Sequence, residues 1–326
     1  MIRLAVIGTN WISDRFVAAA LKSGEYTLTA VYSRKLASAK QFGRKYTAKY
    51  YFDCLESLAA SAEVDAVYIA SPNSLHASQA MIMMRQGKHV MVEKPMASNI
   101  RQVEQMFEVA KASNVVLFEA YMAPFTPNFQ LAKQAVESIG PVRLAHLSYC
   151  QYSSRYQKYL DGENPNTFNL EFSNGSIMDI GYYCVGAAVE LFGAPDTIHA
   201  SAHRLDSGVD GSGSVILSYP QFNVVLSHSK TSDAQTPSEI QGESGSVLID
   251  MVSFGRRVER IRRGGPCEDL TVAQDDNPML YEARVFANQV TKNKMTTEYI
   301  ERSLLVAQII TDIRHQTGVI FPADSQ

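Results

Sequence analysis

The sequence predicts an α/β protein in which a doubly wound parallel sheet is followed by an α+β domain with a mostly antiparallel, open sheet. Over residues 1–120, short apolar segments alternate with amphipathic ones, which is typical of parallel strands joined by helices. Beyond Pro124 and Pro127, successive β-rich segments are separated by turn residues, as in hairpins. We therefore expect two domains, residues 1–122 and residues 123–326.

The elements of the first domain follow from the spacing of apolar residues and from the residues that end each segment. The first helix places Phe16, Val17 and Ala20 on one face and ends at Gly24. The expected strands are Leu4–Ile7, Thr27–Tyr32, Val64–Ala70, His89–Glu93 and Val115–Ala120, and the expected helices are Ser13–Ser23, Leu36–Tyr46, Ser74–Gln86 and a Ser98-capped helix to about Ala112. In such sheets ligands bind beyond the carboxyl ends of the strands.

The second domain is expected to open with the helix Asn128–Ser138, which ends at Gly140-Pro141. The expected strands are Val142–Gln151, Asp196–Arg204, Gly213–Tyr219, Phe222–Lys230, Pro237–Gln241, Ser246–Asp250 and Phe254–Arg262, and two helices, Met279–Lys292 and Thr297–Gln316, are expected to finish the chain.

The composition of the 326 residues excludes several classes of protein. A net charge of -3 gives no reason to expect nucleic acid or an anionic membrane as a partner. The four cysteines are scattered without a C-x-x-C pair, so neither a metal site nor a disulfide framework is indicated. The chain starts without a signal-peptide pattern and holds no apolar stretch long enough to span a bilayer, so we expect a cytoplasmic protein.

The stretch "VIGTNWISDRF" reads G-T-N-W-I-S where a dinucleotide-binding loop reads G-x-G-x-x-G. Gly8 supplies the glycine of the tight turn. Asn10 tolerates a left-handed conformation better than most residues, and Ser13 is small enough for close helix–strand packing and can cap the helix. On its own, the loop leaves a nucleotide site and an ordinary strand-to-helix turn equally open.

The end of the second expected strand favours NADP over NAD. NAD-binding domains usually carry a carboxylate there for the ribose 2′-hydroxyl, but no Asp or Glu lies between Glu25 and Asp53. Ser33 and Arg34 offer a hydroxyl and a guanidinium, which suit a 2′-phosphate. The alternative is a solvated basic helix face, and we adopt it for the basic residues of the segment 40–49.

Two further segments carry a resemblance to a known family. "SPNSLHA" (Ser71–Ala77) and "GKHVMVEKPMA" (Gly87–Ala97), together with the Gly8 loop, resemble the Gfo/Idh/MocA oxidoreductase superfamily over essentially the whole chain. The E-K-P after a G-K-H-V strand is a specific signal, whereas the glycine loop is not. The resemblance implies an NAD(P)-dependent oxidoreductase that acts on CH–OH groups.

The family pattern also implies a helix in the second domain that begins D-x-G-x-H. Here "SIMDIGYYCVGAAVELFG" supplies Asp179 and Gly181, with Tyr183 where His is common. This departure resembles the dihydrodiol dehydrogenases and glucose–fructose oxidoreductase rather than the inositol dehydrogenases. Asp179 and Tyr183 are four residues apart and share a helix face. The alternative is a packed aromatic and a helix cap, but the resemblance favours a site.

The resemblance implies that Lys94, Asp179 and Tyr183 are catalytic. In the family the Lys-Pro bond is often cis, which turns Lys94 toward the nicotinamide. A free phenol has a pKa near ~10, and a nearby ammonium lowers it. We therefore expect Tyr183 to exchange the hydroxyl proton, Lys94 to position the substrate oxygen and tune Tyr183, and Asp179 to orient substrate or Lys94.

The same resemblance implies where the cofactor lies. The pyrophosphate and nicotinamide end would contact the loop Gly8, Thr9, Asn10, Trp11 and Ile12, the adenosine phosphate would contact Ser33 and Arg34, and the remaining contacts would come from Ser71, Asn73, His76, Glu93 and Lys94. For His76, a ligand contact and a structural hydrogen bond stay equally open.

The leading hypothesis is an NADP-dependent oxidoreductase, with NAD as the alternative cofactor, that acts on a sugar, a polyol or a trans-dihydrodiol. A reductase of a non-sugar substrate and a non-catalytic NAD(P)-sensing regulator are the alternatives. The resemblance also implies a homodimer or a dimer of dimers through the open sheet, whose segments "VVLSHSK" and "SGSVILSY" alternate apolar and small polar residues. The segment 152–168, with Arg155, either closes over substrate or lies at a surface or subunit contact.

Overall fold

A computed structural model describes residues 1–325 and divides them into two compact units. Unit 1 comprises Met1–Tyr121 and Asp275–Leu304, and unit 2 comprises Met122–Gln274 and the segment that starts at Leu305. The first boundary lies where the sequence places it, near residue 122. The expected second domain, residues 123–326, differs from unit 2 because residues 275–304 pack within unit 1.

Unit 1 is built on a six-stranded sheet with the order β3-β2-β1-β4-β5-β6, and its strands pair in parallel. The strands are β1 (Ile2–Ile7), β2 (Tyr26–Tyr32), β3 (Tyr50–Phe52), β4 (Ala66–Ile69), β5 (His89–Glu93) and β6 (Leu117–Ala120). The helices are α1 (Trp11–Ser23), α2 (Leu36–Lys45), α3 (Leu55–Ala59), α4 (Asn73–Arg85), α5 (Ile100–Ala112) and α9 (Met279–Lys292). The order changes direction at β1, which places the switch point between β1 and β4.

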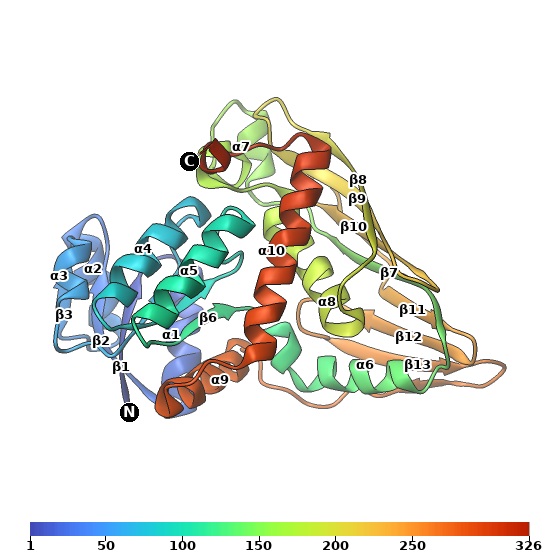
Figure 1. Ribbon diagram of the computed structural model, residues 1–326, viewed down its shortest axis with the longest axis horizontal. Coiled ribbons are helices and arrows are strands. Elements are labelled where there is room, and N and C mark those ends of the chain that lie inside the picture. The colour runs from blue at the N-terminus through green and yellow to red at the C-terminus, as the bar shows by residue number, and fades with distance from the viewer. Residues whose placement is uncertain (326) are drawn as a thin grey trace. The chain divides into compact units, whose positions relative to one another are not determined.

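The return of α9 to unit 1 has a clear physical cause. Its apolar face, which includes Ala283 and Phe286, is buried, and α9 packs beside α1 (Figure 1). The Tyr26 hydroxyl donates to the Ala283 carbonyl at 2.5 Å, and Lys22 pairs with Asp275 at 2.6 Å. An apolar periodicity predicts the helix but not the partner that its face covers.

Unit 2 contains an eight-stranded sheet with the order β14-β13-β12-β11-β7-β10-β9-β8. Its strands are β7 (Val142–Cys150), β8 (Thr197–Arg204), β9 (Asp210–Ser218), β10 (Asn223–Ser229), β11 (Ser238–Gly242), β12 (Gly245–Asp250), β13 (Arg257–Arg262) and β14 (Cys267–Asp269). The pair β7–β10 is parallel, and the other pairs are antiparallel. The expected parallel sheet and mostly antiparallel sheet are therefore both confirmed.

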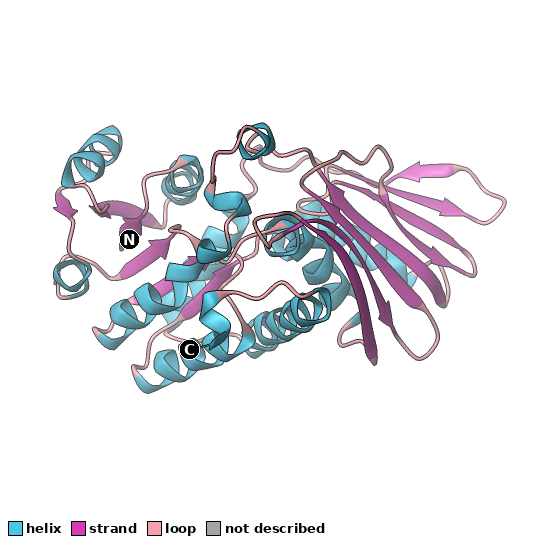
Figure 2. Ribbon diagram, turned by 90° about the horizontal axis from the view of Figure 1, so that it is seen from above, coloured by secondary structure: helices cyan, strands magenta, loops and turns pink. Residues whose placement is uncertain are grey.

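Helices cover one face of this second sheet. Helix α6 (Pro127–Glu137) packs against β12 and β13, and α8 (Tyr182–Phe192) packs against β7 and β10 (Figures 1 and 2). A short helix, α7 (Tyr156–Leu160), follows β7, and α10 (Thr297–Thr317) is divided between the two units. The strands alternate accordingly, with Val224 and Leu226 of β10 fully buried and Val225 between them partly exposed.

Local details differ from the sequence expectations. Asn99 rather than Ser98 caps α5, since its side chain accepts the Gln102 N–H. The turn Ile177–Gly181 before α8 is π-helical, and the short elements α3, β3 and β14 carry too few residues to show a periodicity. Within residues 1–325, no helix is long and apolar enough to cross a membrane.

Candidate active site

The carboxyl ends of β1, β2, β4 and β5 carry the residues that the sequence assigns to the cofactor. The Gly8 loop follows β1, Ser33 and Arg34 follow β2, Ser71 and Asn73 follow β4, and Lys94 follows β5. Because parallel strands end at one edge of the sheet, the topology brings these segments together on either side of the switch point.

The Gly8 loop is built differently from a glycine-rich loop. Gly8 has a φ of 107°, and a Cβ there would lie 2.8 Å from the Ala70 carbonyl oxygen, so the turn requires glycine. Asn10 is extended rather than left-handed, and its side chain caps α1 by accepting the Ile12 and Ser13 N–H groups at 3.0 and 3.1 Å. Its amide also donates to the Ala70 carbonyl at 3.0 Å, which ties β1's loop to β4's.

This geometry corrects two expectations about the loop. Asn10 does not replace the second glycine through a left-handed conformation, and the cap is Asn10 rather than Ser13. The Ile12 and Ser13 N–H groups are bonded to Asn10, so a cofactor would meet the loop through the neighbouring residues. Trp11 is 65% exposed at the first position of the helix, which excludes a core role for this side chain.

The end of β2 offers the groups that a 2′-phosphate requires. Arg34 is exposed and Ser33 is partly exposed directly after the strand. By contrast, Lys45 forms an ion pair with Asp14 at 2.5 Å, and the Tyr46 hydroxyl donates to the same carboxylate at 2.6 Å. This supports the structural interpretation for Lys45, while Arg34 and Lys35 are the exposed cations that directly follow β2. The donor set at this edge fits NADP.

The His76 side chain connects the loop after β4 with the loop after β5. Its ring is 1% exposed, with Nδ1 at 3.0 Å from the Pro95 carbonyl and Nε2 at 2.9 Å from the Ser71 carbonyl. Burial lowers the pKa of His76, and the charge of Lys94 acts in the same direction. Both ring nitrogens therefore face backbone carbonyls, which favours the structural alternative for this residue. The Ser71 hydroxyl donates to Gln79 at 2.7 Å.

The E-K-P segment rests on a buried group of carboxylates. The Lys94–Pro95 bond is cis, and Glu93 accepts a hydrogen bond from the Tyr68 hydroxyl. The Met96 N–H donates to Glu119 at 2.9 Å. Burial and the charge of Glu93 raise the pKa of Glu282, a residue of α9, well above its usual range. Lys94 itself is partly exposed.

In unit 2, Asp179 and Tyr183 lie at the start of the helix that covers the sheet. Asp179 belongs to the π-helical turn, and Tyr183 lies in the first turn of α8. Both side chains are partly exposed. The Tyr183 ring packs against Tyr149 of β7 and Tyr182, with centroids 5.7 and 6.2 Å apart. Single π-helical turns inside helices are frequent at functional sites.

Sequence reasoning missed the residues that hold this turn. Lys230 forms an ion pair with Asp179, while Asp210 accepts the Ile177 N–H at 2.6 Å. His228 Nδ1 lies 2.9 Å from the Ser176 hydroxyl. The only signal was the polar end of an otherwise apolar strand, "VVLSHSK", where His228 and Lys230 share the inward face with Val224.

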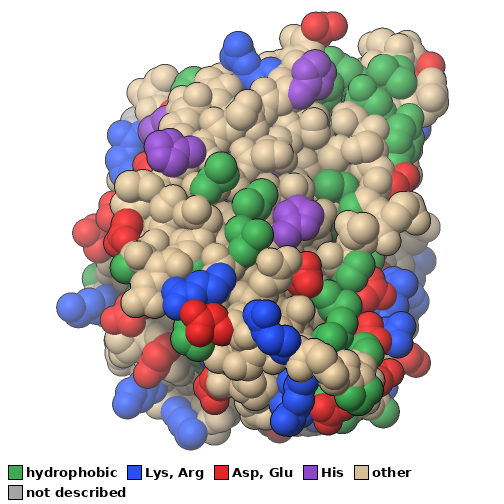
Figure 3. Space-filling model, turned by 90° about the vertical axis from the view of Figure 1, so that its right-hand side faces the viewer, with side chains coloured by type: hydrophobic (Ala, Val, Ile, Leu, Met, Phe, Trp, Pro, Cys, Tyr) green, Lys and Arg blue, Asp and Glu red, His purple; other side chains and the backbone are tan. Residues whose placement is uncertain are grey.

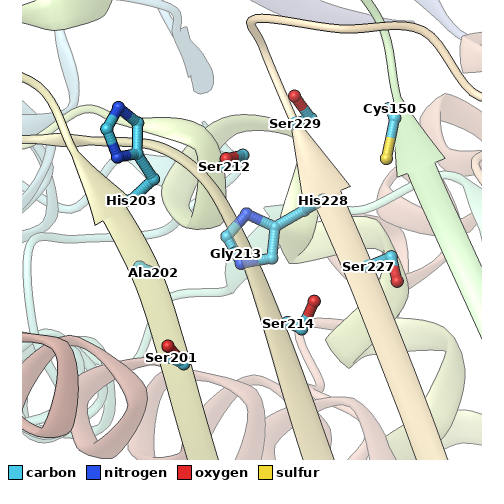
Figure 4. Close-up of a pocket in the computed structure, with 10 residues that line it drawn as sticks. All are labelled: Cys150, Ser201, Ala202, His203, Ser212, Gly213, Ser214, Ser227, His228 and Ser229. Carbon is cyan, nitrogen blue, oxygen red and sulfur yellow. The ribbon is translucent and has the colours of Figure 1, made fainter.

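A hollow of about 400 Å³ lies on the same sheet and shares His228 with the anchors of this turn (Figure 4). It is lined by small polar side chains and two histidines: Cys150, Ser201, Ala202, His203, Ser212, Gly213, Ser214, Ser227, His228 and Ser229. Neither Asp179 nor Tyr183 lines it. In the segment 152–168, Tyr156 and Tyr159 pack on the buried cluster of Phe168, Leu205 and Val209, and Arg155 is exposed.

Two family models match the chain. Residues 2–121 match the oxidoreductase family with an NAD-binding Rossmann fold, and residues 129–248 match the GFO/IDH/MocA C-terminal domain. No group of metal-ligating side chains able to hold an ion occurs in the part of the chain that the structure describes.

Relatives of known sequence match over the full length. The chain is 51% identical to an uncharacterized oxidoreductase of Escherichia coli, over 100% of this chain and 99% of that one. It is 48% identical to the scyllo-inositol 2-dehydrogenase (NADP(+)) of Bacillus subtilis, over 99% of both chains. Trans-1,2-dihydrobenzene-1,2-diol dehydrogenase of Sus scrofa is 26% identical over 99% of both chains.

Among solved structures, a mutant of a 3-ketoreductase from Actinomadura kijaniata, in complex with TDP-benzene and NADP, superposes with a TM-score of 0.87. It is 25% identical and covers 97% of this chain and 98% of that one. The resemblance that the sequence motifs carry is thus confirmed over both domains. The chain belongs to the Gfo/Idh/MocA family of NAD(P)-dependent oxidoreductases.

Proposed function

We propose that this oxidoreductase transfers hydride between NADP and a hydroxyl-bearing carbon of a cyclic polyol of the inositol class. The cofactor is NADP. The substrate proposal is supported by the 48% identity to a scyllo-inositol dehydrogenase over nearly the whole of both chains, against 26% for a dihydrodiol dehydrogenase. The tyrosine at position 183, which resembles that of the dihydrodiol dehydrogenases, is therefore a weaker guide to the substrate than the identity over the whole chain.

The chemistry is supported by the residue types that the family motifs supply, Lys94 in unit 1 and Asp179 and Tyr183 in unit 2. When bound, NADP accepts or supplies the hydride. Oxidation also requires a base for the hydroxyl proton, and we assign this role to Tyr183. We also propose that Lys94 positions the substrate oxygen and that its ammonium favours the phenolate. In the reductive direction Tyr183 is the acid.

Unit 2 also offers a surface for a second copy of the chain. On the sheet face away from α8, the row His146, Val225, Ile216 and His199 runs across β7, β10, β9 and β8. Ile216 and Leu144 are 42% and 39% exposed. Figure 3 shows histidine and hydrophobic side chains on this face, with many charged side chains gathered toward one end. We propose a homodimer, or a dimer of dimers, through this face, and a cytoplasmic location.

The substrate proposal is tested by following NADPH absorbance with the purified chain. Scyllo-inositol, myo-inositol, glucose and a trans-dihydrodiol are supplied with NADP, and the ketone formed by oxidising one inositol hydroxyl is supplied with NADPH. We expect the cyclic polyol to give the highest kcat/KM. A higher kcat/KM for glucose or the dihydrodiol would show that the substrate belongs to another class. Cofactor binding without turnover of any of these compounds would favour a sensor.

The role of Tyr183 is tested with Tyr183→Phe. Because the variant keeps the ring and loses the proton, kcat should fall on the order of a hundredfold or more, while NADPH affinity stays near the wild-type value. Tyr182→Phe removes the neighbouring hydroxyl and should retain turnover. Lys94→Ala and the double variant complete a cycle on kcat/KM, in which strongly non-additive effects are expected if the two residues act on one proton. Wild-type turnover in Tyr183→Phe would remove Tyr183 from the mechanism.

A further inference from the structure

The π-helical turn that carries Asp179 is held by three side chains from β9 and the end of β10. Asp210, at the start of β9, accepts the Ile177 N–H at 2.6 Å. His228 contacts the Ser176 hydroxyl at 2.9 Å through Nδ1. Lys230, the residue after β10, forms an ion pair with Asp179. The turn is therefore fixed at its first residues and at the aspartate itself.

The Lys230 side chain is unusual because it is almost fully buried. It is 7% exposed, whereas its partner Asp179 is 38% exposed. Lysines are rarely buried unless they are paired, and Asp179 is the ionic partner of Lys230. The backbone N–H of Lys230 also donates to the Gly211 carbonyl at 2.8 Å, which fixes the root of the side chain.

The surrounding charges identify Lys230 as the cation of this cluster. His228 is 2% exposed, and burial lowers its pKa to about 4, so its ring is neutral at pH 7. Burial raises the pKa of Asp210 to about 6, and the charge of Lys230 counteracts this. At neutral pH the cluster thus holds two carboxylates, Asp179 and Asp210, and Lys230 supplies the positive charge that both experience.

We infer that Lys230 is a positioning residue for the reaction, acting through Asp179. This inference rests on the proposed function of Asp179 and Tyr183. The ion pair holds the Asp179 carboxylate in one orientation on the π-helical turn. Tyr183 lies in the first turn of α8, which continues directly from the π-helical turn, so a fixed turn also fixes where the backbone of Tyr183 begins.

Lys230 is distinct from Lys94, the lysine that the family motif supplies. Lys94 belongs to unit 1 and follows β5, whereas Lys230 belongs to unit 2 and follows β10. We expect Lys230 to affect how productively substrate is held, rather than how tightly cofactor binds.

The test compares Lys230→Met, Lys230→Arg and a matched control. Methionine keeps most of the buried volume and removes the charge, so kcat with the polyol should fall about tenfold or more, as for other residues that orient a site from behind. Arginine restores the charge and should recover part of the loss. Lys133→Met removes another ion pair to the same helix, with Glu190 at 2.8 Å, and should leave kcat near wild type.

A cycle with Asp179→Asn and the double variant shows whether Lys230 works through Asp179. We expect the double variant to be little worse than Asp179→Asn alone. NADPH affinity, measured from Trp11 fluorescence, should be unchanged throughout. Wild-type kcat in Lys230→Met, additive effects in the cycle, or an equal loss in Lys133→Met would each overturn the inference. Absence of polyol turnover in the wild-type chain would instead overturn the proposed function.

Discussion

At the scale of single residues, the loop after β1 is shaped by one asparagine side chain where the G-x-G-x-x-G pattern has further glycines. Asn10 caps α1, ties its loop to β4 and leaves Gly8 as the position that requires a positive φ. Sequence reasoning placed Gly8 and Asn10 in the site but gave Asn10 the wrong conformation. An asparagine suits both a left-handed turn and a helix cap, and only the backbone decides between them.

The same scale gives a test of the NADP assignment. Arg34→Ala should raise the Kd for NADPH about tenfold or more and leave that for NADH unchanged, because a charge-assisted bond to the 2′-phosphate is lost. Trp11, the only tryptophan, reports binding by quenching. Lys40→Ala removes a nearby exposed cation and serves as the control. If Arg34→Ala raised the Kd for NADPH and for NADH equally, Arg34 would belong to the solvated basic surface and not to the 2′-phosphate site.

At the scale of elements, the apolar pattern predicted most strands and helices, and several bounds agree with the structure to within a residue. His89–Glu93 and Met279–Lys292 coincide with β5 and α9. The π-helical turn and its anchors were not predicted. A π-helical turn has no apolar period of its own, and Asp210, His228 and Lys230 meet it only because β9 and β10 are neighbours in the folded sheet.

The anchors of this turn make stability depend on pH in opposite directions. His228 has a folded pKa of about 4, below its usual value of 6.5, so its contribution is present above pH 6.5 and is lost as pH falls toward 4. Asp210 has a folded pKa of about 6, above its usual value of 3.8, so its contribution is present below that value and is lost as pH rises through 6. Between pH 7 and pH 5 the two changes offset one another.

Substituting one of the two groups should therefore reveal the pH dependence of stability that the other contributes. From pH 7 to pH 5, the free energy of unfolding of His228→Gln should rise by about 2 kcal/mol relative to wild type, and that of Asp210→Asn should fall by about 1 kcal/mol. Denaturant titrations at several pH values measure both. The free energy of unfolding of the two variants could instead change with pH just as that of wild type does. That result would show that neither group titrates as its burial requires.

At the scale of the whole chain, the sequence predicts two folding units but not their membership. Residues 275–304 return to unit 1 because α9 has an apolar face that fits α1 and a backbone carbonyl that accepts the Tyr26 hydroxyl. Contacts between residues some 250 positions apart leave no local pattern in the sequence. The family motifs depend on local spacing alone, and in the structure Lys94 directly follows β5 and Tyr183 lies in the first turn of α8.

The open sheet of unit 2 leads to the last prediction, which concerns assembly. Ile216 and Leu144 lie exposed on the sheet face opposite to α6 and α8, and exposed apolar side chains gathered on one face mark an interaction surface. Ile216→Lys combined with Leu144→Lys should convert a dimer to a monomer in light scattering, because each lysine would have to be buried unpaired between two copies. Ile320→Lys changes a side chain that is 49% exposed outside the sheet, and should leave the dimer intact. A wild-type chain that scatters as a monomer at all concentrations, or a double variant that remains dimeric, would show that this face does not join two copies.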